Sequence, residues 1–277
     1  IIGREPHNFY NRMGIARLLY GRSAMKGLYL IDENWYEKKS IQPYLNTQVK
    51  SIDRENKTLQ LGLSESIQYD RLILACGGEA FVPEVPGSDL SGVYVLRTAD
   101  DAMGLRAYSQ DNNCSHAVIA GGGLLGLEAA YALGEMGLKV TVLERGQWLM
   151  RRQLDRRAGE FLRILLSQLG IDIMTNAEVA RFHGEKQLDK VELKDGCIIE
   201  AQLTLVAAGV VPNTDLAKSC GLEVQRGIIV NDRLQSSDES IYVVGDAAEH
   251  RGRVYGLWTT AADQGKIVAD NVLGAQR

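Results

Sequence analysis

The sequence predicts an α/β protein in which one structural unit occurs twice. Residues 117–120 form a short apolar segment that runs into a glycine-rich turn and then into an Ala/Leu-rich segment, the order of strand, turn and helix. Residues 57–77 and 189–209 align without a gap at an offset of 132. With 277 residues, 45% of them hydrophobic and 24% charged, the chain has an ordinary globular composition and room for two domains.

Charge and cysteine usage exclude several classes of function. The formal net charge is −4 with both signs scattered, so we expect no nucleic-acid partner and no membrane partner. Apolar segments such as residues 203–211 are much shorter than the roughly 20 residues that span a bilayer. The four cysteines are far apart and form no CxxC pair, so we expect buried, reduced thiols, no metal site and a cytoplasmic location.

The glycine-rich turn has the spacing G-x-G-x-x-G, at Gly121, Gly123 and Gly126. In a dinucleotide site the first glycine makes the tight turn, the second lets the backbone approach a pyrophosphate, and the third lets the helix lie close to the sheet. The helix predicted over residues 124–136 provides unpaired N–H groups and a positive dipole end for the phosphates. The spacing taken alone also fits a plain structural turn.

An acidic residue follows at the position that a dinucleotide site requires. Residues 138–143 predict the next strand, which ends in Glu144, 23 positions after Gly121. A carboxylate there accepts hydrogen bonds from the adenosine ribose and repels a 2′-phosphate. We therefore expect NADH rather than NADPH as the cofactor, although the neighbouring Arg145 leaves the alternative open.

The repeated segments predict two Rossmann-like domains. Their paired apolar positions are Leu59 with Val191, Leu61 with Leu193, Ile67 with Ile199, and Ile73 with Leu205. At the same offset, the first copy of the glycine-rich turn would fall about eleven positions before Ile1, so we expect that this segment is missing from the chain. The alternative explanation is that the two segments are unrelated β-meanders that share only the alternation of apolar and polar residues.

Two further segments carry local signals. Leu154, Phe161, Leu162, Leu165 and Leu169 predict an amphipathic helix that stops at Gly170. Residues 241–244 predict a buried strand that ends in Gly245-Asp246, where a carboxylate can accept sugar hydroxyls. A Gly-Asp pair is also common in ordinary turns.

These segments together resemble the FAD-dependent pyridine nucleotide reductases of the ferredoxin/rubredoxin reductase branch, and above all the flavin module of the NADH-dependent nitrite reductase large subunit. The resemblance covers nearly the whole chain. The matching segments are FYNR (9–12), YDRLILACGG (69–78), VLRTADDA (95–102), GGGLLGLEAA (121–130), LMRRQLD (149–155), AAGVVPNTDLA (207–217), SIYVVGDAAEHRGRVYGL (240–257) and a closing helix from Ala261.

The resemblance implies a glutathione-reductase-like arrangement with the NAD domain inserted in the FAD domain. Its parts are residues 1–100 for FAD, residues 101–213 for NAD, and residues 214–277 for FAD again. The family's C-terminal interface domain is not found before the last residue, and Cys76 stands where the family has threonine. We therefore expect a module that belongs to, or works with, a larger enzyme.

The resemblance also implies roles for single residues. Glu128 would lie beside the nicotinamide and pair with Arg17 next to the flavin ring. Asp246 would bind the FAD ribityl chain and Arg97 would lie by the FAD adenylate, in a helix start capped by Thr98 and Asp101. Ordinary surface roles for Glu128 and Arg97 stay open, as does a core role for Trp258. The expected cofactor-binding residues are Arg12, Arg97, Ala75, Gly77, Gly121, Gly123, Leu125, Gly126, Glu144, Gly209, Gly245, Asp246 and Trp258.

The activity implied by the resemblance is hydride transfer from NADH to FAD, followed by electron transfer to an iron-sulfur, siroheme or rubredoxin-like acceptor. A stand-alone rubredoxin or ferredoxin reductase, or a nitrate reductase electron-transfer subunit, is an alternative within the same class. A flavoprotein of the apoptosis-inducing-factor kind, which acts mainly by binding a partner, is an alternative from another class.

Overall fold

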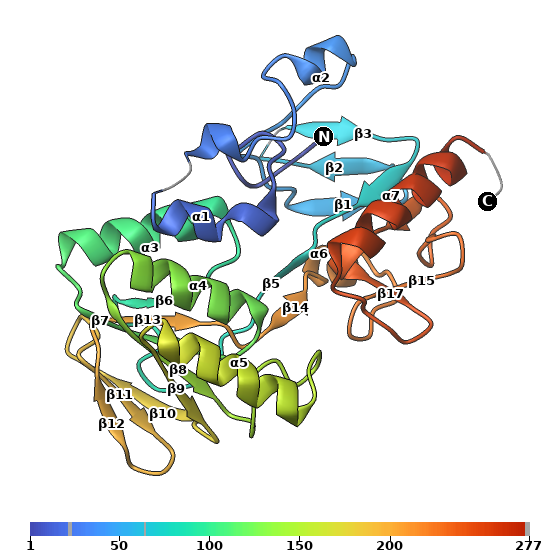
Figure 1. The fold of residues 1–277 in the computed structure, drawn as a ribbon. Helices are drawn as coiled ribbons and strands as arrows, with labels where there is room; N and C mark the ends of the chain where they lie inside the picture. The colour runs from blue at the N-terminus through green and yellow to red at the C-terminus, as the bar shows by residue number, and fades with distance from the viewer. Residues whose placement is uncertain (22–23, 64, 275–277) are drawn as a thin grey trace. The chain divides into compact units, whose positions relative to one another are not determined.

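The computed structural model describes residues 1–21, 24–63 and 65–274. The chain divides into two compact units (Figure 1). The first unit combines Ile1–Asn8, Asp32–Glu79 and Val210–Arg277, and the second unit combines Phe9–Ile31 and Ala80–Gly209. Most of the second unit is therefore inserted, in sequence, between segments of the first.

The second unit is built on a parallel sheet. Its five strands lie in the order β6 (Val93–Tyr94), β13 (Leu203–Val206), β7 (His116–Ala120), β8 (Lys139–Glu144) and β9 (Ile171–Thr175). The helices of this unit are α1 (Ala16–Leu19), α3 (Ala99–Asp111), α4 (Leu124–Glu135) and α5 (Arg156–Gln168), with 3₁₀ turns at Arg12–Gly14 and Met25–Gly27.

Both faces of this sheet are buried. On β7, Ala117 and Ile119 pack in one core cluster with helix residues such as Leu127 of α4. Val118 points to the other face and packs with Phe182 in a second cluster. The second cluster lies under an antiparallel sheet of β10 (Val179–His183), β11 (Lys190–Leu193) and β12 (Ile198–Glu200), which Figure 1 shows on the far side of the sheet from α4.

The first unit contains a smaller set of paired strands. Three of them, β1 (Ser51–Asp53), β2 (Thr58–Gln60) and β3 (Ser66–Gln68), form an antiparallel sheet. Two parallel pairs join β4 (Leu72–Leu74) to β16 (Ile241–Val243) and β15 (Ile228–Val230) to β17 (Ala248–His250). The other elements are β5 (Gly78–Ala80), β14 (Val210–Pro212), α2 (Trp35–Lys38), α6 (Asp215–Ser219), the 3₁₀ turn η3 (Gly245–Ala247) and α7 (Trp258–Val272).

The duplication is present in the structure at the predicted offset. Strands β2, β3 and β4 correspond to β11, β12 and β13, and β3 and β12 match residue for residue at 132 positions. Leu59 and Leu61 are buried like their counterparts. The paired apolar residues Ile73 and Leu205 differ in burial: Ile73 is 44% exposed, whereas Leu205 is fully buried. Leu205 lies on a strand with neighbours on both sides, whereas β4 pairs with β16 alone among the described residues.

Helix α5 is present, but its predicted apolar face is wrong. Phe161, Leu165 and Leu169 are exposed, whereas Gly159 and Leu166 are buried. The buried side is turned by about one residue from the predicted one, because α5 packs on the edge strand β9. An exposed apolar stripe remains along the helix.

Other boundaries agree more closely with the sequence. Helix α4 begins at Leu124 as expected, and Gly137 follows it with a φ of +91°. Helix α7 begins at Trp258, three residues before the predicted Ala261. The division into parts 1–100, 101–213 and 214–277 concerns the cofactor that each part binds, and stays a prediction. None of the helices in the described ranges combines the length and apolar character needed to cross a bilayer.

Replacing Gly126 by alanine is expected to destabilise the protein, because the new Cβ would collide with the carbonyl oxygen of Gly121. Overpacking of this kind costs about 1–3 kcal/mol. Gly134→Ala in the same helix is the matched control: its Cβ would meet no atom within 4 Å, so helix propensity predicts a gain of about 1 kcal/mol. Urea unfolding measures both changes, and wild-type stability in G126A would contradict the close approach.

Candidate nucleotide site

A cavity of about 380 Å³ lies in the second unit at the carboxyl ends of three parallel strands. Ala120 of β7, Leu143 of β8 and Val206 of β13 line it. From β7 the sheet continues to β8 and β9 on one side, and β13 lies on the other side. The strand order therefore reverses beside β7, and open parallel sheets bind their ligands at such a reversal.

The glycines of the turn differ in how a side chain would fit at each position. Gly121 has a φ of +140°, and a Cβ there would collide with the carbonyl oxygen of Ala207. Gly126 lies against Gly121, which lets α4 start directly at the end of β7. Gly123 differs from both, because its φ is −87° and a Cβ there would meet nothing within 4 Å. The empty space at Gly123 faces the cavity that the residue lines.

The start of α4 is open to a ligand. Gly123 is its N-cap and has no side chain to bond the first N–H groups. These groups and the helix dipole favour an anion at this point, as in phosphate-binding turns. The bare backbone at Gly123 and the uncapped helix start thus fit the pyrophosphate of a dinucleotide.

Glu144 lies buried at the end of β8, and its carboxylate is held in place from two sides. Oε2 accepts a hydrogen bond from the Gly122 N–H at 3.2 Å, and Oε1 accepts one from the Gly146 N–H at 2.6 Å. Arg151 Nε lies 3.4 Å from Oε1. A carboxylate has about four acceptor positions, so ribose hydroxyls can still be accepted. Sequence reasoning missed Arg151, because a loop brings it back to Glu144.

The residues expected beside the nicotinamide lie on neighbouring helices. Arg17 belongs to α1 and Glu128 to α4, and these two helices pack together. Both side chains are exposed, and the described residues contain no ion pair between them. Although the residue as a whole is exposed, neighbouring protein atoms partly desolvate the Glu128 carboxyl and raise its pKa above its ordinary value. Their roles at the nicotinamide and flavin stay a prediction.

In the first unit, Asp246 lies in a turn that packs against α7. Gly245 has a φ of +73°, and its N–H donates to Gln264 Oε1 at 2.7 Å. A Cβ on Gly245 would lie 3.5 Å from that of Ala261 in α7. Helix α7 begins at Trp258 without a side-chain cap, and Trp258 is 65% exposed. A half-buried carboxylate beside an uncapped helix fits a ligand that carries hydroxyls and phosphate.

The chain segments that link the two units carry three more expected residues. Gly77 has a φ of +63° and its carbonyl oxygen accepts the Asn213 N–H at 2.9 Å, next to Ala75 and Cys76. Asn213 Nδ2 donates to the Cys76 carbonyl at 2.8 Å. Gly209 has a φ of +121° and its carbonyl accepts the Phe81 N–H.

The two arginines expected near FAD both lie in the second unit. Arg12 Nη1 donates to the Arg97 carbonyl oxygen at 2.8 Å, and its guanidinium lies 5.5 Å from the ring centre of Tyr10. The predicted cap of α3 is confirmed, because Thr98 and Asp101 form a reciprocal capping box. This cap fixes the backbone beside Arg97.

The expectation of buried cysteines is wrong for two of the four. Cys76 and Cys197 are exposed, whereas Cys114 and Cys220 are partly buried. Cys76 lies two residues after β4, and Cys197 lies in the turn between β11 and β12. None of the four forms a disulfide in the structure, and within the described ranges no cluster of His, Cys, Asp and Glu could hold a metal ion.

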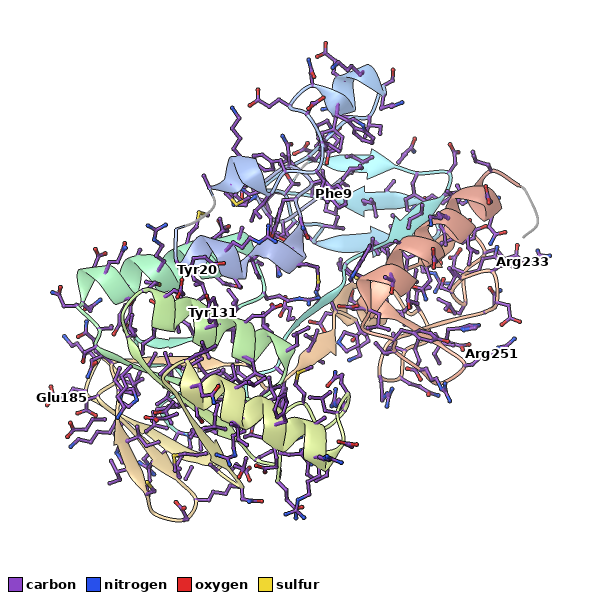
Figure 2. The ribbon with its side chains drawn as sticks, in the orientation of Figure 1. Phe9, Tyr20, Tyr131, Glu185, Arg233 and Arg251 are labelled. Carbon is purple, nitrogen blue, oxygen red and sulfur yellow. The ribbon has the colours of Figure 1, made fainter. Side chains whose placement is uncertain are left out.

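A second hollow of about 670 Å³ lies on the first unit, beside β15 and β17. Asp232 in its lining accepts hydrogen bonds from Arg251 Nη2 and from His250 Nε2, both at 2.8 Å. Hydrogen bonds from Arg251 and then from His250 lower the pKa of Asp232 to about 2. Figure 2 shows Arg233 and Arg251 at the surface of this unit. The hollow is a paired, exposed surface, in contrast to the cavity at the glycine-rich turn.

A glycine-rich turn at a strand-order reversal, with a buried acid on the next strand, defines a nucleotide-binding α/β protein. The chain belongs to the pyridine nucleotide-disulphide oxidoreductase family, which matches residues 1–265. It is 38% identical over 274 residues to the assimilatory nitrate reductase electron transfer subunit of Bacillus subtilis (strain 168), and 40% identical over 276 residues to the nitrite reductase (NAD(P)H) of the same organism.

These alignments cover 99% and 100% of this chain but 35% and 34% of the two relatives. The chain thus spans about a third of their length. A ferredoxin reductase from Rhodopseudomonas palustris has the same fold, with a TM-score of 0.93, 29% identity, and coverage of 100% of this chain and 70% of that one. The predicted family and fold class are confirmed.

Gly123→Ala is expected to weaken nucleotide binding without destabilising the fold. The new Cβ enters empty space in the free protein, where the glycine-rich turn is expected to receive the pyrophosphate. We expect the Kd for ADP-ribose to rise about tenfold or more, measured by calorimetry, with unchanged urea unfolding. Gly134→Ala is the control on the same helix, and unaltered ADP-ribose affinity in G123A would place the phosphates elsewhere.

Glu128→Gln is expected to flatten the dependence of stability on pH. Because the folded pKa of Glu128 is raised above 4.5, the folded state binds more protons than the unfolded state between pH 4.5 and the folded pKa. The stability of the wild type therefore falls as pH rises through that window, and glutamine removes this loss. Urea unfolding at about pH 4 and about pH 7 tests it; equal losses in both proteins would contradict the raised pKa.

Proposed function

We propose that the chain is an NADH-oxidising FAD module that passes electrons to an iron-sulfur or siroheme centre, as in the nitrite reductase large subunit. The observation that carries the proposal is the nucleotide cavity with its open space at Gly123 and its buried acid, Glu144. Membership of the pyridine nucleotide-disulphide oxidoreductase family supports it. The two Bacillus subtilis relatives, which act in nitrate and nitrite reduction by name, support a role in nitrate assimilation.

We assign the nucleotide contacts to the second unit. The turn from Gly121 to Gly126, with Leu125 at the helix start, holds the pyrophosphate, and Glu144 accepts the ribose hydroxyls. Gly209 leaves room for the nicotinamide. Glu128, whose pKa is raised by desolvation, and Arg17 set the local field for hydride transfer.

We assign FAD to residues that fit its polar groups. Asp246, at the carboxyl end of β16, accepts the ribityl hydroxyls, and Gly245 gives access to its backbone. Ala75, Gly77, Trp258, Arg12 and Arg97 complete the proposed set. When bound, FAD accepts a hydride from the nicotinamide and gives up electrons one at a time.

The proposed partner is an iron-sulfur or rubredoxin-like electron carrier, either a separate protein or a further part of the same polypeptide. The ferredoxin reductase likeness supports this kind of acceptor. The unpaired cysteines support a cytoplasmic location. The proposed cofactor domains are residues 1–100 and 214–277 for FAD and residues 101–213 for NAD.

The rivals differ in what happens after reduction. A stand-alone rubredoxin or ferredoxin reductase would reduce a small soluble carrier with no further domain. A flavoprotein of the apoptosis-inducing-factor kind would be reduced slowly and would act through a partner. Cys76 has no cysteine partner, so an internal disulfide acceptor has no support.

Anaerobic addition of NADH to the full chain loaded with FAD tests the proposal. We expect the visible absorbance of the flavin to disappear within the mixing time, and to return when an artificial electron acceptor is added. Asp246→Asn is expected to lower FAD retention, whereas Asp263→Asn on the exposed face of α7 is the matched control. Slow reduction would favour the partner-binding rival, and a bound flavin that NADH does not reduce would overturn the proposal.

A further inference from the structure

Helix α5 carries a continuous row of large apolar side chains that the chain itself does not cover. The four members of the row are all exposed: Phe161, Ile164, Leu165 and Leu169. Residues three or four positions apart lie on the same side of a helix, so the row runs along one face of α5. Apolar side chains that are exposed singly are ordinary, whereas a contiguous row indicates a surface that another molecule covers. We name this row the α5 ridge.

The core of the second unit uses the opposite side of α5. Gly159 and Leu166 are buried, and Leu162 packs against the core cluster to which Leu166 belongs. The start of the helix is fixed as well, because the Asp155 side chain accepts the Ala158 N–H at 2.8 Å. The α5 ridge is therefore held in place by the fold without contributing to its core.

A positive charge stands at the first end of the ridge. Arg157 precedes Phe161 by four residues, so it continues the same row, and the first turn of α5 contains Arg156 as well but no acid. Positive charge is unfavourable there, because the start of a helix is the positive end of its dipole. Neither arginine forms an ion pair within the described ranges, whereas Arg163 pairs with Glu160 at 2.9 Å. The charges of the two arginines are thus available to an acidic group from outside the chain.

The size and spacing of the ridge fit a single helix. A helix that docks through its apolar face uses anchors at positions i, i+3 or i+4, and i+7, which is the spacing of the ridge. The 13 residues of α5 extend for about 20 Å. A standard interface between two globular proteins buries about 800 Å² on each side, more than one such row presents. Acidic residues in the first turn of the docked helix would stabilise that helix and would also complement Arg157.

A second copy of this chain does not supply the complementary charge. Two α5 helices paired in antiparallel fashion would place Arg157 opposite residues 164–170, which contain no acid. A parallel pairing would place Arg157 opposite its own counterpart, and like charges repel. Charge complementarity therefore favours a different protein as the partner.

We propose that the α5 ridge docks an amphipathic helix of another protein, whose acidic first turn lies beside Arg157. The apolar face of that helix covers the ridge, and its carboxylates pair with the arginines at the start of α5. This inference does not rest on the proposed function, because it uses neither the nucleotide cavity nor the residues assigned to FAD.

Fluorescence anisotropy with two labelled synthetic peptides tests the inference on the full 277-residue chain in the presence of FAD. Both peptides have about 18 alanine-rich residues, long enough to form a helix, with leucines along one face. One peptide has three glutamates in its first turn, and the other has glutamines at the same positions. We expect the acidic peptide to bind about tenfold or more tightly than the neutral one, the range of charge-assisted contacts. Equal binding of the two peptides would overturn the inference.

Variants of the chain locate the binding. Arg157→Glu should remove the preference for the acidic peptide and leave the affinity for the neutral peptide unchanged, so differences in peptide helicity cancel. Phe161→Gln should weaken both peptides about tenfold. Ile198→Gln on β12 is the matched control, because Ile198 is 58% exposed and Phe161 is 60% exposed, and it should bind both peptides like the wild type. Unchanged urea unfolding of the three variants shows that they fold.

Analytical ultracentrifugation of the chain alone distinguishes the partner from a second copy. We expect a monomer whose sedimentation is the same in the wild type and in Phe161→Gln. A dimer that Phe161→Gln dissociates would overturn the inference, because a second copy would then cover the ridge.

Discussion

The close approach of Gly126 to the Gly121 carbonyl oxygen determines where α4 lies on the sheet, and the cavity depends on it. Because no side chain separates them, the helix starts directly at the end of β7. The fully buried Ala129 and Ala130 extend this close contact along the helix. The first N–H groups of α4 then reach the cavity, and Gly123 remains bare. A larger residue at position 126 would move these groups away from a bound phosphate.

The parts of the fold that depend on neighbours in sequence were predictable. Strands β7 and β8, helix α4 and the acid at 144 follow from alternation, glycine spacing and chain length. The capping box of Thr98 and Asp101 depends on four consecutive residues and was predicted for the same reason. The buried side of α5 was not, because it depends on which strand forms the edge of the sheet. Likewise, the segment Phe9–Ile31 belongs to the second unit through tertiary packing, which its sequence does not reveal.

The charge balance of the cavity could not be predicted from the sequence, for a related reason. Arg151 lies seven residues after Glu144, and only the turn at Met150, with a φ of +52°, returns it to the carboxylate. Gly146 gave a weak signal, since a glycine directly after the strand leaves room for a guanidinium. A whole-chain charge of −4 averages over such local arrangements. The electrostatic character of the cavity therefore depends on the loop as much as on the acid.

The four long helices of the described ranges are of two kinds, which differ in how they begin. Thr98 caps α3 and Asp155 caps α5 with side-chain hydrogen bonds, so their first N–H groups are satisfied within the protein. Helices α4 and α7 have Gly123 and Leu257 as their N-cap residues, without side-chain cap hydrogen bonds. These two are the helices assigned to NAD and to FAD. The strands of the two copies are alike because each needs only an alternating pattern of apolar residues. The uncapped starts of α4 and α7 have a different requirement, since each leaves N–H donors that a bound phosphate would satisfy.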